Sequence, residues 1–260
     1  MERITQVFNT LREQSQTGFI PFSVAGYPNR EKSLEIFLAL AEEGGDILEF
    51  GFPFSDPVAD GPVIRKAAVE AIRGGITMDA ALEMVADIRK RSEIPIIFFG
   101  YFNPILKYGP ERFVSAAKSC GVDGVLVVDL PREEARWLKP LSDKAGLAWI
   151  YLATPTTSDA RIRTMDDEGS GFLYYVSTTG VTGAKDSLPP GLAEKCAKVR
   201  RACRLPLAVG FGISRPEHAS LLKPHVDAVV VGSAILSQIQ NGYSLDALRG
   251  WVREMKSALR

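Results

Sequence analysis

Residues 18–51 read GFIPFSVAGYPNREKSLEIFLALAEEGGDILEFG and contain the pattern that decides the fold. Two β-rich runs, 18–24 and 46–51, are separated by a stretch whose apolar residues recur at helical spacing. These apolar residues are Leu34, Phe37, Leu38 and Ala41. A strand, an amphipathic helix and a second strand in this order predict parallel strands joined by a crossover helix.

The same alternation continues to the end of the chain. We predict eight strands, over residues 18–24, 46–51, 94–100, 124–129, 147–152, 171–177, 205–210 and 228–232. Eight such units favour an α/β fold with one closed (β/α)8 barrel, the TIM barrel, as a single domain over residues 1–260, with an extra N-terminal helix. The alternative is a doubly wound open sheet in two domains, but no Pro/Ser-rich linker or change in composition divides the chain.

The composition excludes several classes of partner. Lys and Arg number 31, as do Asp and Glu, so no basic excess is available for a nucleic-acid backbone or an anionic membrane. The longest uncharged apolar run, 94–106, is too short to span a bilayer. The start, MERITQVFNTLREQ, lacks the apolar core of a secretory signal. Three cysteines without CxxC spacing predict free thiols and a cytoplasmic protein.

The carboxyl ends of the strands are where a closed parallel barrel gathers its functional residues. Glycines follow the last three predicted strands: Gly180, Gly183, Gly210, Gly212 and Gly232. Glycine lets backbone N–H groups approach an anion, and a helix beginning at Ser233 would direct its positive end to the same place. These turns predict a site for one phosphate group. The alternative is that the glycines only permit tight turns.

Glu49 is predicted to point into the barrel, because alternation along its strand puts Leu48 and Phe50 on the face toward the helices. Desolvation there raises the pKa of a carboxyl group, which suits it to exchange protons near neutral pH. The alternative is a structural glutamate paired with a buried cation, although no Lys or Arg occurs in the other predicted strands.

The loop after this strand, 52–62, contains Asp56 and Asp60 among prolines and a glycine that shape its backbone. Each aspartate either carries chemistry or forms an Asx turn. Asp129, at the end of the strand over 124–129, either caps a turn or orients a loop.

Apolar and aromatic residues near the strand ends either line a pocket for a flat apolar ligand or pack in the core. They are Phe22, Ile64, Tyr101, Phe102, Tyr174 and Phe211. We expect no metal, because His218 and His225 have no Cys or second His at ligand spacing. No predicted strand contains a lysine for Schiff-base chemistry.

Six motifs in order identify a known family. The most specific is LEFGFPFSDPVADGP at 48–62, followed by DLPREE at 129–134, TPTTS at 154–158, GVTG at 180–183, GFGIS at 210–214 and VGSAI at 231–235. With these motifs the chain closely resembles the tryptophan synthase alpha subunit family from its first helix to its last. The resemblance implies a (β/α)8 barrel that cleaves indole-3-glycerol phosphate to indole and glyceraldehyde 3-phosphate by a retro-aldol reaction, without a cofactor in this chain.

The resemblance also implies roles for individual residues. Glu49 corresponds to the acid/base glutamate, Asp60 to the partner of the indole nitrogen, and Asp56 to a contact with the partner subunit. The implied substrate-binding residues are Phe22, Ile64, Tyr101, Tyr174, Thr182, Gly183, Phe211, Gly212, Gly232 and Ser233. Arg65 departs from the family pattern, in which we expect glutamine at this position. The departure affects what the resemblance implies about the contacts of the helix after Asp60.

The implied partner is a beta subunit that contains pyridoxal phosphate, in an alpha2beta2 complex. Two alternatives stay open at this point: another phospho-sugar barrel enzyme, which the SDPVADG loop argues against, and a catalytically silent barrel that activates a beta subunit. Loss of Glu49 or Asp60 would favour a silent barrel, and both residues are present.

Overall fold

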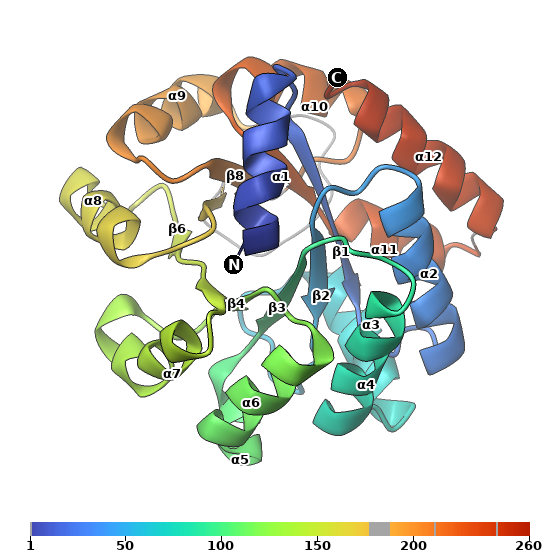
Figure 1. Ribbon diagram of the computed structural model, residues 1–260. Helices are drawn as coiled ribbons and strands as arrows, with labels where there is room; N and C mark the ends of the chain where they lie inside the picture. Colours follow the sequence, from blue (N-terminus) through green and yellow to red (C-terminus); the bar gives the residue numbers. More distant parts are fainter. Residues whose placement is uncertain (1, 177–187, 211, 243) are drawn as a thin grey trace.

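The computed structural model describes residues 2–176, 188–210, 212–242 and 244–260 as parallel strands surrounded by helices (Figure 1). The strands are β1 (Gly18–Val24), β2 (Leu48–Gly51), β3 (Ile96–Gly100), β4 (Gly124–Val127), β5 (Ala148–Trp149), β6 (Leu152–Ala153), β7 (Leu173–Val176), β8 (Leu207–Gly210) and β9 (Ala228–Val231). The helices are α1 (Glu2–Glu13), α2 (Arg30–Glu42), α3 (Pro62–Arg73), α4 (Met78–Arg89), α5 (Phe102–Tyr108), α6 (Pro110–Cys120), α7 (Lys139–Lys144), α8 (Asp159–Glu168), α9 (Leu192–Ala202), α10 (Pro216–Leu222), α11 (Ser233–Gln240) and α12 (Leu245–Ser257), with 3-10 turns η1 (Arg132–Trp137) and η2 (Lys223–His225).

The sheet closes on itself through one short segment. Its strand order is β5-β4-β3-β2-β1-β9-β8-β7-β6, and the described pairs are parallel. The two ends of this order, β5 and β6, are separated in the chain only by Ile150 and Tyr151. Because β5 pairs with β4 and β6 pairs with β7, this segment joins both edges. The predicted (β/α)8 barrel is confirmed.

The prediction of one continuous strand over 147–152 is wrong, and the described strands therefore number nine rather than eight. The backbone N–H of Ile150 donates to the Val125 carbonyl at 3.0 Å, whereas the Tyr151 carbonyl accepts from Tyr174 at 3.0 Å. The chain therefore changes its pairing partner between these two residues, which interrupts the ladder. Most other strands begin or end a residue or two inside the predicted ranges.

Alternation along the strands divides the apolar residues into two cores. One set fills the barrel and includes Ile20, Ile47, Ile97, Leu126 and Ala148. The other set packs between the strands and the helices and includes Phe19, Leu48, Phe98, Val125 and Trp149. A residue that follows the alternation of the first set therefore points into the barrel.

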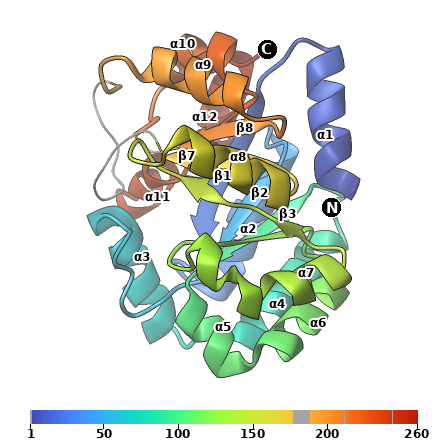
Figure 2. The same ribbon diagram turned by 90° about the vertical axis from the view of Figure 1, so that its left-hand side faces the viewer.

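Helix α1 covers one end of the barrel (Figures 1 and 2). Ile4, Phe8 and Leu11 lie on one face of this helix, are buried, and pack with the residues that fill the barrel. The extra N-terminal helix expected from the sequence therefore closes this end of the barrel and shields the residues inside it from solvent, like a plug.

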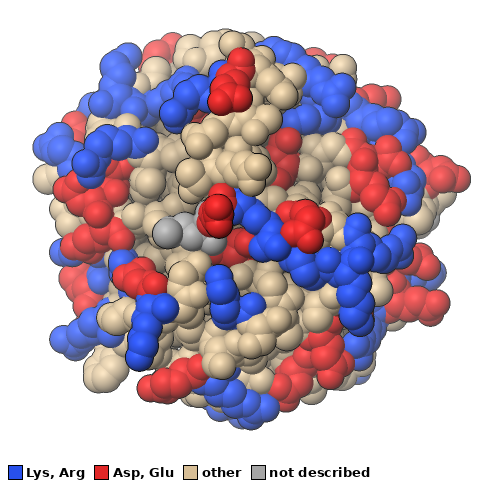
Figure 3. Space-filling view, viewed as in Figure 1, with Lys and Arg blue, Asp and Glu red and all other residues tan. Residues whose placement is uncertain are grey.

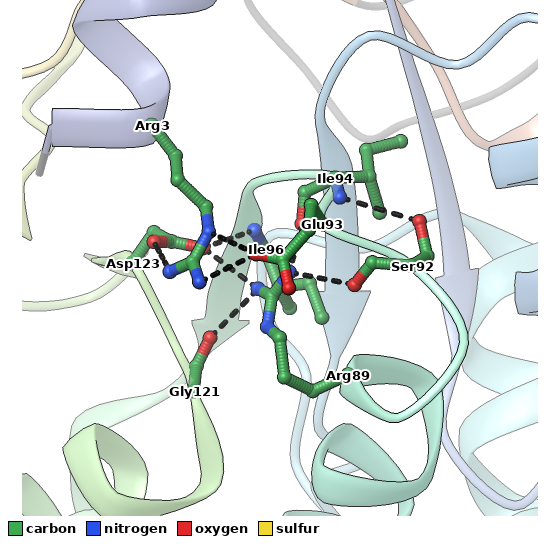
Figure 4. A network of polar contacts seen from close by, with 8 residues as sticks. All are labelled: Arg3, Arg89, Ser92, Glu93, Ile94, Ile96, Gly121 and Asp123. Carbon is green, nitrogen blue, oxygen red and sulfur yellow. Dashed lines mark hydrogen bonds and ion pairs between the residues drawn. The ribbon is translucent and has the colours of Figure 1, made fainter.

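A polar network ties α1 to the strands it covers (Figure 4). Arg3 donates to Glu93 at 2.7 and 2.9 Å and to Asp123 at 3.1 Å. Asp123 also accepts from the Arg89 guanidinium at 2.8 Å, and Arg89 donates to the Gly121 carbonyl at 2.8 Å. Because Asp123 is buried, these donors compensate the loss of its hydration. The network fixes the loops before β3 and β4 against the plug.

On the face that carries α1, basic and acidic side chains are interspersed (Figure 3). Many of them form ion pairs, for example Arg3 with Glu93 and Lys256 with Asp46, each shorter than 3 Å. Within the described ranges, none of the helices combines the length and apolar character needed to cross a bilayer.

Candidate active site

A cavity opens among the carboxyl ends of the strands and the loops that follow them. It measures about 440 Å³, including the part open to solvent. Its lining residues are Phe22, Glu49, Asp60, Ile64, Phe99, Tyr174, Gly212, Ile213, Val230, Gly232 and Ser233. Two carboxyl groups, an aromatic wall and a glycine-bearing helix start therefore face one space.

Glu49 sits on β2 between two apolar neighbours. In the parallel ladders its Cα partners are Phe22 on β1 and Ile97 on β3. Leu48 and Phe50, on either side of it in the chain, pack outward against the helices. Alternation along β2 therefore turns the Glu49 side chain into the barrel, where apolar residues surround it.

Burial dominates the electrostatics of Glu49. The residue is 1 % exposed, and its Oε1 has no hydrogen-bond partner among the described residues. Desolvation raises its pKa well above the ordinary value for glutamate, and no nearby cation lowers it. The alternative of a structural glutamate paired with a cation thus finds no support in the described part of the chain. A carboxyl group of this kind keeps its proton to higher pH than an exposed glutamate and can still exchange it.

Asp60 is the second buried carboxylate, and Tyr101 holds it. The Tyr101 hydroxyl donates to Asp60 at 3.0 Å and accepts from the backbone N–H of Ala59 at 3.2 Å. Burial raises the pKa of Asp60 to about 6, while the hydrogen bond from Tyr101 opposes the rise. Asp60 is therefore ionised above pH 6, and its other oxygen has no hydrogen-bond partner among the described residues.

The two tyrosines near these carboxyl groups stay protonated. Burial is the largest cause that raises the pKa of Tyr174, and the charges of Glu49 and Asp60 raise it further. Burial and Asp60 raise the pKa of Tyr101 in the same way. At neutral pH both hydroxyls therefore keep their protons, and that of Tyr101 is engaged in the hydrogen bond to Asp60.

Another part of the cavity wall is formed by the start of a helix. Helix α11 begins at Ser233, and its N-cap residue Gly232 supplies no side-chain hydrogen bond to the first turn. The N–H groups of that turn and the positive end of the helix dipole therefore remain available to a ligand. A Cβ on Gly232 would lie 2.8 Å from the Phe22 ring, so only glycine allows this close approach. Gly212 lies on the same side with φ of +85°, a left-handed turn conformation.

The structure brings together most of the residues that the sequence singled out. Phe22, Glu49, Asp60, Ile64, Tyr174, Gly212, Gly232 and Ser233 line the cavity. Tyr101 does not line it but contacts Asp60. Asp56 is exposed on the loop surface and accepts from the Ser55 hydroxyl at 2.5 Å. Thr182, Gly183 and Phe211 lie outside the described residues.

Three residues of the wall were not identified from the sequence: Phe99, Ile213 and Val230. Phe99 packs edge-on against Phe22, with ring centroids 5.2 Å apart. Alternation from Ile97 along β3 is the signal that could have found it. Val230 follows Ala228 in the same way along β9, whereas Ile213 lies in a loop that has no periodicity.

Two further residues have clear structural positions. Asp129 accepts from the backbone N–H of Phe102 at 2.7 Å, which joins the end of β4 to the start of α5. This contact fits the second interpretation of Asp129, the orientation of a loop. Arg65 is exposed on α3 and does not line the cavity.

A search of the described residues for groups of three or more His, Cys, Asp or Glu side chains that could hold a metal ion finds none. The polar groups of the cavity are the carboxyl groups of Glu49 and Asp60 and the backbone donors at the start of α11. Such an arrangement can move protons at one end of a ligand and hold a phosphate at the other.

Comparison with known proteins gives the same family over nearly the whole chain. The family model for the tryptophan synthase alpha chain matches residues 8–259. The tryptophan synthase alpha chain of Citrifermentans bemidjiense is 44% identical over 262 residues, which cover 100% of this chain and 98% of that protein.

Solved structures agree. The tryptophan synthase alpha chain of Legionella pneumophila is 35% identical with a TM-score of 0.90 and coverage of 99% of this chain and 97% of that one. A chain of Mycobacterium tuberculosis tryptophan synthase is 31% identical with a TM-score of 0.91 and coverage of 99% and 98%. The barrel and its cavity agree with these similarities, and the chain belongs to the tryptophan synthase alpha chain family.

Proposed function

We propose that this chain is a carbon–carbon lyase of tryptophan biosynthesis that cleaves indole-3-glycerol phosphate to indole and glyceraldehyde 3-phosphate. The observation that carries the proposal is the pair of buried carboxyl groups, Glu49 and Asp60, which line one cavity together with the start of α11. Membership in the family supports the same reaction. The proposal includes no cofactor in this chain.

The proposed mechanism is a retro-aldol cleavage in which Glu49 moves protons and Asp60 stabilises charge. Glu49 donates its proton to carbon 3 of the indole ring, and positive charge spreads to the ring nitrogen. The free oxygen of Asp60 accepts a hydrogen bond from the ring N–H and offsets that charge.

Carbon–carbon cleavage then follows. A base, for which we propose Glu49 in its ionised form, removes the proton from the glycerol hydroxyl next to the ring. The bond from carbon 3 to that glycerol carbon breaks, its electron pair returns to the ring system, and the oxygen becomes the aldehyde carbonyl. Glu49 regains its proton, so the cycle needs no redox step or external reagent. The phosphate, held by the first turn of α11, positions the bond with binding energy from a remote group.

Incubation of the purified chain with indole-3-glycerol phosphate tests the proposal directly. We expect indole and glyceraldehyde 3-phosphate in equal amounts, measured by chromatography and by an aldehyde-coupled assay. Failure to form indole both alone and with a beta subunit would favour the silent barrel. Turnover of a different phospho-sugar in place of this substrate would favour the other barrel enzyme.

We also propose that the chain binds a tryptophan synthase beta subunit, which contains the pyridoxal phosphate, in an alpha2beta2 complex in the cytoplasm. Large apolar side chains are exposed on three segments that follow adjacent strands: Val58 in the loop after β2, Leu106 in α5 after β3 and Trp137 in η1 after β4, at 80 %, 54 % and 60 % exposure. Exposed apolar residues on neighbouring segments are typical of a protein interface. Asp56 is exposed on the same loop as Val58.

Binding of the partner is expected to raise the cleavage rate. A subunit that docks on the loop 52–62 can favour the closed arrangement of Asp60 over substrate, and couplings of this kind are about 5–150-fold. Titration of the chain with beta subunit, with indole production as the readout, measures the effect. Asp56→Ala should weaken the stimulation without changing the rate of the isolated chain. A complex that leaves the cleavage rate unchanged would refute the coupling.

The proposed phosphate site at the start of α11 is tested by the substitution Gly232→Val. The new side chain would collide with the Phe22 ring and cover the first turn of α11. We expect inorganic phosphate and glycerol phosphate to inhibit the parent competitively, and to inhibit the variant roughly 10–100-fold more weakly, as expected for lost charge-assisted hydrogen bonds. Gly250→Val on α12 is the control, because a Cβ there would meet only the end of the Arg253 side chain, at 4.0 Å. Equal inhibition of the two variants would place the phosphate elsewhere.

The role of Tyr101 is tested by Tyr101→Phe. In the parent, the Tyr101 hydroxyl donates to Asp60 and so favours its ionised form. Removal of this hydroxyl therefore raises the pKa of Asp60 above 6. Because the ionised carboxylate is the reactive form, the acidic limb of the pH profile of kcat/KM should move to higher pH. The rate at high pH should fall less than the rate near pH 6. An acidic limb at its original pH would show that the hydrogen bond does not control Asp60.

A further inference from the structure

We propose that Gln240 is a positioning residue that, through helix α11, holds Asp60 at a set distance from the phosphate site. The inference deepens the proposed function and rests on it. Its basis is a contact between two segments far apart in the sequence: the Gln240 side-chain amide donates to the Val63 carbonyl, 177 positions away, at 2.8 Å.

Helix α11 has a functional contact at each end. Its first residue, Ser233, lines the cavity beside Gly232, where the phosphate is proposed to bind. Its last residue is Gln240. Eight helical residues span about 12 Å, and a short helix with four buried apolar side chains, Ala234, Ile235, Leu236 and Ile239, moves as a rigid body. Both views show α11 beside α3 (Figures 1 and 2).

The contact with Gln240 falls at the start of α3. The first helical residue there is Pro62, which follows the N-cap residue Gly61. Val63, which accepts from Gln240, lies in the first turn. The next residue, Ile64, lines the cavity, and Asp60 comes three positions before Val63. A shift of this turn therefore moves both residues of the site.

Asp60 is thus held from two directions. Tyr101, at the end of β3, binds its carboxylate, and Gln240, after β9, binds the helix that follows it. In the proposed substrate the phosphate and the ring nitrogen are joined by a chain of limited length. The separation between the start of α11 and Asp60 therefore decides whether the carboxylate meets the ring nitrogen. Errors of about 1 Å in such positions can cost as much as 10²-fold in rate.

The experiment is Gln240→Met in the full chain, since methionine has nearly the same length and no N–H donor. We expect kcat for indole-3-glycerol phosphate to fall about tenfold, because the first turn of α3 is less well fixed. Inhibition by inorganic phosphate should stay within about twofold of the parent, because the start of α11 is unaltered. Gln238→Met is the matched control, since the Gln238 side chain makes no hydrogen bond within the described residues.

A double-mutant cycle with Asp60→Asn separates positioning from general damage. If Gln240 acts by placing Asp60, then Gln240→Met should lower the rate much less in the Asp60→Asn background than in the parent. An equal loss in both backgrounds, or an unchanged kcat in the single variant, would overturn the proposal. So would a weakening of phosphate inhibition that matches the loss of kcat.

Hydrogen exchange gives a readout that does not depend on activity. Amides of the segment 54–66 should exchange faster in Gln240→Met than in the parent or in Gln238→Met, and equal exchange would overturn the anchoring role. A parent chain that makes no indole would refute the proposed function, and the exchange result would still decide whether Gln240 holds α3.

Discussion

Glu49→Gln is expected to reduce cleavage of indole-3-glycerol phosphate by about 10²–10⁴-fold, the range typical of a general acid or base. The amide keeps the shape of the side chain but cannot deliver a proton to the ring or accept one from the hydroxyl. Single-turnover measurement of indole, together with the inhibition constant of inorganic phosphate, separates chemistry from binding. We expect phosphate inhibition to be unchanged. A rate within about threefold of the parent would rule out the proton shuttle.

The stability of Glu49→Gln distinguishes a chemical loss from unfolding. Burial raises the pKa of Glu49 in the folded protein, so the folded state retains a proton that the unfolded state releases. The contribution of Glu49 to the stability of the parent is therefore greatest below the ordinary pKa of glutamate. This contribution is lost as pH rises through the raised pKa. Glutamine does not ionise.

The variant should consequently be more stable than the parent at pH 7–8, by about 1–2 kcal/mol, in the range typical of stabilising changes at functional sites. The difference should vanish near pH 4, where glutamate is largely protonated in both states. Urea denaturation at both pH values measures it. A variant that is less stable at neutral pH would indicate that Glu49 has a structural partner.

Asp60→Asn is expected to slow cleavage by about 10²–10³-fold, the cost of losing one oriented electrostatic partner in a buried site. The amide accepts a hydrogen bond from the ring N–H but carries no charge to offset the positive ring. The acidic limb of the pH profile, which the pKa of Asp60 near 6 produces in the parent, should also disappear.

Substrate binding should be retained in Asp60→Asn, because the phosphate contacts and the aromatic wall are unaltered. Equilibrium binding of substrate to the slow variant tests this. Asp246→Asn, at an exposed position in the first turn of α12, is the control for loss of a surface carboxylate. Equal rates for parent and Asp60→Asn would show that the loop carboxylate only shapes the backbone.

Local patterns in the sequence are sufficient for much of this site. The alternation in 46–51 predicts that Glu49 points into the barrel, and in the structure it lines the cavity while Leu48 and Phe50 pack outward. The position of Ser233 just after a strand predicts a helix start, and α11 begins there. These predictions succeed because each depends on a periodicity or a boundary within a few residues.

Predictions about pairing partners had no such local signal. A run of six apolar residues, 147–152, indicates one strand, yet it is divided because each half pairs with a different neighbour. Phe99 was missed as a wall residue although it alternates with Ile97, because its contact with Phe22 depends on the register of three strands.

The sequence by itself determined the order of strands and helices, the inward face of β2 and the presence of two carboxyl groups near strand ends. Only the tertiary structure decided which groups meet: Tyr101 with Asp60, 41 positions apart, and Gln240 with Val63, 177 positions apart. The physical reason is that periodicity specifies the face on which a side chain lies, whereas the closure of the barrel specifies its neighbour across the sheet. The raised pKa values of Glu49 and Asp60 arise only after that closure, because desolvation requires the walls that other strands supply.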